Sequence, residues 1–254
     1  MKNTFKLWKD IIANPFEGYK GLNENTKILL PLLTIIVLFV ISITMIVPIL
    51  LSEPYSEAIV RAQIATMAER GNEMSSEQQA AMAEQMKSPM VKNITIASSY
   101  AGGLLTFFLM TLAAALILKL TVSSMKKDKV KFSLVFKILI FASIVAMVQS
   151  ILKMGITLTG NWERALSRVN DTGSLQQVLQ TPISLAALFD ASGMNRTLYM
   201  LIDTLTDVFN WIYYIFVYAG LKVAVQLEKK QALTATIIIA VISVVIGAAF
   251  TLIG

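Results

Sequence analysis

ILLPLLTIIVLFVISITMIVPILL, residues 28 to 51, is a run of 24 residues without a charged side chain. As an α-helix it would be roughly 36 Å long, because each residue adds about 1.5 Å, and the hydrocarbon core of a bilayer is about 30 Å thick. The run is also longer than the apolar part of a signal peptide, which has about 7–15 residues. We therefore interpret it as a retained membrane-spanning helix and expect the rest of the chain to belong to a membrane protein.

The composition of the whole chain agrees with this class. Hydrophobic residues make up 56% of the 254 residues and charged residues only 15%, whereas soluble domains carry about 25% charged residues. Four further apolar segments predict a single all-α domain over residues 1–254 with five membrane spans. The predicted spans are residues 28–51, 95–118, 133–158, 198–225 and 232–253.

Lys and Arg are densest in the segment before the first span, in the loop after the second and in the link after the fourth. Basic residues favour the cytoplasmic side of a membrane. We therefore expect a cytoplasmic N-terminus and two helical extracytoplasmic excursions, residues 52–94 and 159–197. This placement also explains the net charge of +6 without nucleic acid as a partner.

The N-terminal segment, residues 1–27, carries aromatic and aliphatic residues at helix-like intervals, interrupted by Asn14-Pro15. This pattern is typical of an amphipathic segment in the headgroup region, with Trp8 and Tyr19 at the interface. A solvated tail is the alternative on the same residues.

The first excursion predicts two helices. Pro54 suits the first turn of a helix that Gly71 ends, and the capping box Ser75 to Gln78 opens a second helix that Pro89 ends. Their apolar residues either pack the two helices together or form an adaptable surface for a partner. In the second excursion we expect short helices at 162–169 and 175–179, followed by an amphipathic segment that begins at Pro182.

The fourth predicted span holds the candidate intramembrane polar site. Asp203, Asp207 and Asn210 have the spacing i, i+4 and i+7, which places them on one face of a continuous helix. Carboxylates inside a membrane are costly and often functional, so a proton or ion pathway is one hypothesis. The other is a structural role, in which water, Lys153 or Arg196 satisfies the carboxylates.

The chain contains neither Cys nor His. Disulfides, thiolate chemistry, catalytic triads with His and HExxH zinc sites are therefore excluded in this chain. It contains no Walker motif either. We predict a non-enzymatic protein without a metal or cofactor.

Two blocks of the sequence resemble bacterial Yip-domain proteins. The segment WKDIIANPFEGY, residues 8–19, with PLL at 31–33, is similar to the opening of that family. SLAALF at 184–189, DVFNW at 207–211 and AGLKV at 219–223 are similar to its late block. The residues that carry the resemblance are Trp8, Asn14, Pro15, Pro31, Phe209, Trp211 and Gly220.

The resemblance implies a multi-pass protein of the bacterial cytoplasmic membrane. Bacterial relatives are often associated with ABC exporters, and the polar excursion 52–94 resembles that of Yip-domain subunits of YknWXYZ-type exporters in Bacillus. It thus implies an accessory subunit that contacts lipid, an ABC ATPase-permease and a membrane-fusion-like adaptor, sometimes in protection from toxic peptides, with a homo-oligomer as a further option. An ion-coupled transporter that uses Asp203 and Asp207 is the alternative function.

Overall fold

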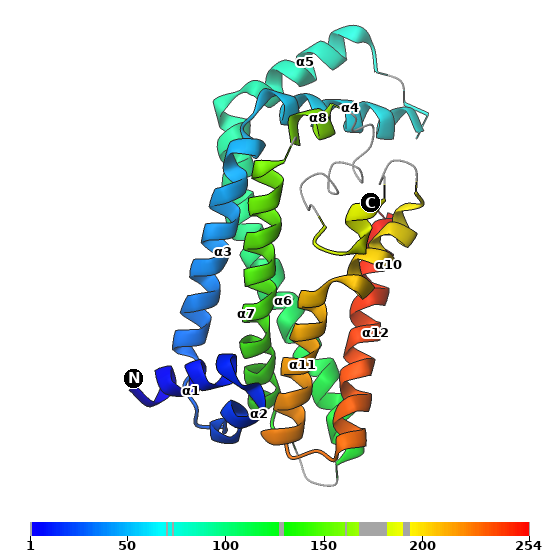
Figure 1. Ribbon diagram of the computed structural model, residues 1–254. Helices are drawn as coiled ribbons and strands as arrows, with labels where there is room; N and C mark the ends of the chain where they lie inside the picture. The colour runs from blue at the N-terminus through cyan, green and yellow to red at the C-terminus, as the bar shows by residue number, and fades with distance from the viewer. Residues whose placement is uncertain are drawn as a thin grey trace. The chain divides into compact units, whose positions relative to one another are not determined.

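The computed structural model describes residues 2–69, 71–72, 74–126, 130–160, 162–167, 182–189 and 194–253, and every regular element in these ranges is helical (Figure 1). The all-α prediction is therefore confirmed. In chain order the helices are α1 (Lys2–Ala13), α2 (Pro15–Gly18), η1 (Tyr19–Gly21), α3 (Leu29–Leu50), α4 (Glu53–Glu69), α5 (Ser76–Lys87), α6 (Pro89–Met125), α7 (Phe132–Thr159), α8 (Trp162–Leu166), η2 (Leu185–Leu188), α10 (Arg196–Thr206), α11 (Val208–Val223) and α12 (Lys229–Ile253).

Four helices of the described chain are long and apolar enough to cross a bilayer, namely α3, α6, α7 and α12. A fifth span exists if the bent pair α10 and α11 crosses as one broken helix. Helix α6 has 37 residues, so it continues on both sides of the predicted span 95–118. The orientation of these spans stays a prediction.

The fourth predicted span, residues 198–225, is not one helix. Asp207 separates α10 from α11 with an extended backbone (φ −73°, ψ 116°), and its N–H donates to the Asp203 carbonyl. Thr204, Thr206 and Asp207 are all weak helix formers. The single continuous face predicted for Asp203, Asp207 and Asn210 is therefore wrong.

The contacts divide the chain into two units, each contributed by three segments. Unit 1 comprises residues 1–39, 104–149 and 208–247, and unit 2 comprises residues 40–103, 150–207 and 248–254. In unit 1, the core centres on the first turns of α7, where five consecutive side chains from Ile138 to Ala142 are fully buried. Side chains of α1, α6, α11 and α12 complete this core.

Unit 2 has its own smaller core, at the end of α3. Ile49 of α3, Ala58 of α4 and Leu166 of α8 are fully buried there. Arg61 of α4 donates a hydrogen bond of 2.8 Å to the Leu166 carbonyl. In Figure 1, α4 lies with α5 and α8, and α4 contacts both of them.

The first excursion forms the predicted pair of helices. Ser75 accepts a hydrogen bond from the Gln78 N–H while the Gln78 side chain accepts one from the Ser75 N–H, so the capping box is confirmed. Helices α4 and α5 contact each other. None of the 12 residues of α5, all of which the structure describes, is buried, so this helix keeps most of its surface open. The predicted helix at 175–179 lies outside the described residues.

The N-terminal segment folds against unit 1, so the interpretation as a solvated tail is wrong. Tyr19, expected at the membrane interface, is fully buried. Its hydroxyl donates to the Ile138 carbonyl at 3.4 Å, and its ring meets Phe141 edge-on. The turn is possible because Gly18 lies against the backbone of Ile11, where a Cβ atom would approach the Ile11 nitrogen to 2.3 Å.

This close approach predicts that Gly18→Ala is destabilising by about 1–3 kcal/mol, since the new methyl group meets backbone that has no room to move. Thermal unfolding of the detergent-solubilised chain measures the effect. Gly102→Ala is the matched control, because nothing lies within 4 Å of a Cβ atom there, and it should be neutral or stabilising by up to about 1 kcal/mol. Equal melting temperatures for the two variants would contradict the packing at Gly18.

Candidate functional site

Lys153, near the end of α7, binds two carboxylates of the broken span. Its Nζ atom lies 3.3 Å from Oδ2 of Asp203 and 3.1 Å from Oδ2 of Asp207. Asp207 is the last residue on the helical path of α10, and its N–H bonds to the Asp203 carbonyl one turn earlier, so both side chains approach the same lysine. Lys153 was expected, beside water and Arg196, as a partner of Asp203, and this contact is confirmed.

The second excursion contributes a further contact to this cluster. The Ser184 hydroxyl donates a hydrogen bond of 2.7 Å to Oδ1 of Asp203 and also accepts one from the Ala186 N–H at the start of η2. Next to it, the Leu185 N–H donates to the Thr206 hydroxyl at 3.0 Å. Segment η2 is thereby attached to α10. We define Lys153, Ser184, Asp203 and Asp207 as the lysine cluster.

The lysine cluster is shielded from solvent to different degrees. The side chain of Asp207 is fully buried, whereas those of Lys153 and Asp203 are 14% and 25% exposed. A buried charge is tolerated in a protein only with a partner that offsets the loss of its hydration. One ammonium and two carboxylates give a formal charge of −1. The arrangement can hold the broken span in place.

Sequence reasoning found three of the four members but missed Ser184. Its hydroxyl was visible in the sequence only as part of a short amphipathic run, and no local spacing relates it to a carboxylate 19 positions later. The structure places Asn210 on α11, three residues beyond the break and in unit 1. Asp203 and Asp207 thus keep the predicted i, i+4 relation and share one lysine, whereas Asn210 lies beyond the break.

A second intramembrane lysine has a role that the sequence did not indicate. Lys137, near the start of α7, is only 7% exposed, and its ammonium group donates to the backbone carbonyls of Asn23 and Glu24 in the turn before α3. Lys131 also pairs with the Glu24 carboxylate. These contacts attach α7 to the N-terminal segment.

The residues of the first sequence block take structural positions. Asn14 caps α2 by accepting the Glu17 N–H at 3.4 Å, and Pro15 is the first residue of that helix. Trp8 is half-buried against the core of unit 1, and Pro31 is buried in the first turn of α3. The block therefore fixes the turn that carries Tyr19 into the core.

The late block is divided between η2, which contains most of residues 184–189, and α11, which contains residues 208–211 and 219–223. A Cβ atom at Gly220 would approach Cγ2 of Ile138 to 2.5 Å, so glycine allows α11 and α7 to pack closely. Phe209 is half-buried, and Trp211 is 57% exposed. The two blocks converge on α7, since Tyr19 and Gly220 both contact Ile138.

The Yip1 domain family matches residues 9–251. The chain belongs to the Yip1 domain family. Together with the apolar helices, this membership assigns the chain to multi-pass membrane proteins. No curated protein and no solved structure matches the chain.

The acidic residues of this Yip1-domain chain do not gather into a metal site within the ranges that the structure describes. The lysine cluster contains two carboxylates, and their shared neighbour is an ammonium group rather than a third acidic ligand. Its chemistry is that of an ion pair within a membrane protein.

The lysine cluster predicts strongly non-additive mutations. Lys153→Met leaves the buried Asp207 carboxylate without its ammonium partner and should destabilise the protein by about 3–5 kcal/mol. In Lys153→Met/Asp207→Asn the unpaired charge is gone, so the double variant should be more stable than Lys153→Met alone. Equilibrium unfolding in detergent for the single and double variants measures this coupling. Additive losses would show that Lys153 and Asp207 do not interact.

Proposed function

We propose that this Yip1-domain protein is a non-enzymatic accessory subunit of a bacterial ABC-type export complex in the cytoplasmic membrane. Its partners in this proposal are an ATPase-permease and a membrane-fusion-like adaptor, as in YknWXYZ-type exporters. The observation that carries the proposal is α5, a polar helix of the first excursion with no buried residue. An accessory subunit needs such an open surface for protein contact.

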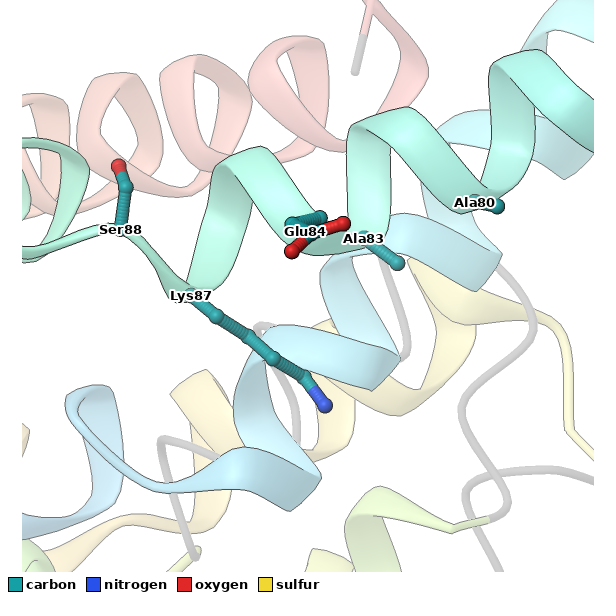
Figure 2. A pocket seen from close by; sticks show the side chains of 5 residues that line it. All are labelled: Ala80, Ala83, Glu84, Lys87 and Ser88. Atoms are coloured by element: carbon teal, nitrogen blue, oxygen red, sulfur yellow. The ribbon is translucent and has the colours of Figure 1, made fainter.

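One face of α5 borders a hollow that a partner can enter. Figure 2 shows its lining residues, which are Ala80, Ala83, Glu84, Lys87 and Ser88. The first four have helical spacing i, i+3, i+4 and i+7, so they share one face. Two alanines leave room beside the backbone, and Glu84 and Lys87 frame that room with opposite charges. This combination suits an inserted apolar side chain with a polar rim.

A single ion pair fixes the end of α5 to the start of α4. Lys87 reaches toward α4 (Figure 2) and pairs with the Glu53 carboxylate. The Lys87 ammonium lowers the pKa of Glu53, and Glu53 raises the pKa of Lys87. The contribution of the pair is therefore lost when the pH falls through the lowered pKa of Glu53 or rises through the raised pKa of Lys87. Across neutral pH both groups are charged and the pair persists.

The chemistry of the chain supports an accessory role rather than a motor or an enzyme. It has no Walker motif, no Cys and no His, so ATP hydrolysis in this proposal belongs to the partner. The lysine cluster is paired internally, which suits a part that holds the fold together. Its structural use favours protein contact over catalysis.

Ion-coupled transport through Asp203 and Asp207 is the second candidate function. The observation that favours it is the formal charge of −1 on the lysine cluster, since carboxylates inside a membrane protein often mark ion pathways. Proteoliposomes that carry the wild-type chain or Asp203→Asn discriminate the two functions. A proton or cation flux that Asp203→Asn abolishes would favour transport, and its absence in both would favour the accessory role.

The hollow beside α5 predicts the effect of two neighbouring alanines on complex formation. Ala80→Arg fills the hollow and should weaken the complex by about 2 kcal/mol, roughly 30-fold in affinity, as at a central interface position. Ala81→Arg is the matched control, because Ala81 is equally exposed but lies about 100° further around the helix. Mild-detergent copurification of the tagged chain, with quantitative mass spectrometry, measures the recovered ATPase-permease and adaptor.

We expect the wild-type chain and Ala81→Arg to recover both subunits in near-stoichiometric amounts. Ala80→Arg alone should recover less of them. Recovery of the wild-type chain alone, or only with copies of itself, would overturn the accessory function. Equal recovery by both variants would show that the partner does not contact the hollow.

A further inference from the structure

Helix α1 runs crosswise at the N-terminal end of α3 (Figure 1). Both belong to unit 1, in which α3 begins at Leu29 after the turn that follows η1. A helix that runs crosswise at the end of a membrane span lies along the membrane surface, because the span itself is directed through the bilayer. The position of α1 is fixed, since Ile11 is fully buried in the core.

Three strips run along the surface of α1, and the exposed Asp10 lies outside them, about 40° beyond Lys6. The first faces the protein and consists of Leu7, Trp8 and Ile11, which pack in or against the core of unit 1. Beside it, Phe5 and Ile12 are 54% and 42% exposed. At 100° per residue these two lie within about 20° of each other around the helix, so they form one apolar strip.

The third strip is basic. Lys6 and Lys9 are exposed and follow the apolar strip at about 40° to 100° around the helix. On the neighbouring α2, Phe16 is 38% exposed, and the ammonium group of Lys222, a residue of α11, lies 5.9 Å from the centre of the Phe16 ring. Exposed aromatic residues next to lysines are characteristic of helices at a membrane interface.

We propose that α1 binds the surface of an anionic bilayer, with Phe5 and Ile12 between the lipid headgroups and Lys6 and Lys9 on their phosphates. The apolar strip gains by leaving water, and each lysine near an anionic surface adds about 1 kcal/mol of attraction. A second copy of this chain is a poorer occupant, because a symmetric contact through this edge brings the lysines of both copies together. The proposal does not depend on the export function.

Because the chain has no Cys, a nitroxide label can be placed at single positions of the full-length protein in lipid nanodiscs. Phe5→Cys reports the apolar strip. Asp10→Cys is the control, since Asp10 is exposed on the same helix but lies about 140° from Phe5. The depth of each label is measured from its collision rates with membrane-soluble oxygen and with a water-soluble nickel chelate. The measurement is repeated in phosphatidylcholine nanodiscs that contain increasing fractions of phosphatidylglycerol.

The label at position 5 should be accessible to oxygen and protected from nickel, and the label at position 10 should show the reverse. Lys6→Gln/Lys9→Gln should then require more phosphatidylglycerol for protection at position 5, with the affinity of α1 for the surface reduced about 30-fold. Lys229→Gln/Lys230→Gln removes the same charge from exposed residues of α12 and should leave position 5 unchanged.

Equal exposure of positions 5 and 10 to the nickel chelate would overturn the proposal, since the apolar strip would then be in water. Protection at position 5 that does not depend on phosphatidylglycerol would overturn the role of the anionic headgroups. If position 5 is protected from the nickel chelate only in nanodiscs with two copies of the chain, the apolar strip binds a second copy rather than lipid, and the proposal is overturned.

Discussion

A charge within an apolar environment is stable only beside a partner, and this constraint organises both units. In unit 2, Lys153 brings Asp203 and Asp207 together and so holds the broken span. In unit 1, Lys137 donates to backbone carbonyls of the turn before α3. Each lysine of α7 therefore fastens a different segment of the chain, and α7 acts as the common support.

Close approach of backbones complements these ionic contacts. Gly220 lets α11 pack on Ile138, and Gly18 lets the N-terminal turn deliver Tyr19 to the same residue. Small residues are effective at such places in membrane proteins because van der Waals contact replaces the hydrophobic effect as the attraction between helices. The two sequence blocks of the Yip1 domain thus serve one packing site.

The surfaces that remain open differ in chemistry. Helix α5 is polar, ends in an ion pair with α4 and borders a hollow, which suits a protein partner. Helix α1 carries an exposed apolar strip beside lysines, which suits a lipid surface. In the two proposals, α5 therefore contacts a protein partner and α1 contacts lipid.

The sequence alone determined the helical membrane class, the capping box at Ser75 and the acidic pair Asp203 and Asp207, because apolar length, helix caps and unusual charges are local properties. The tertiary structure decided where the fourth span breaks, that Ser184 joins the cluster and that Tyr19 is buried. Each of these depends on contacts between residues far apart in the chain, where packing and charge pairing override local preference. No spacing along the sequence encodes such contacts.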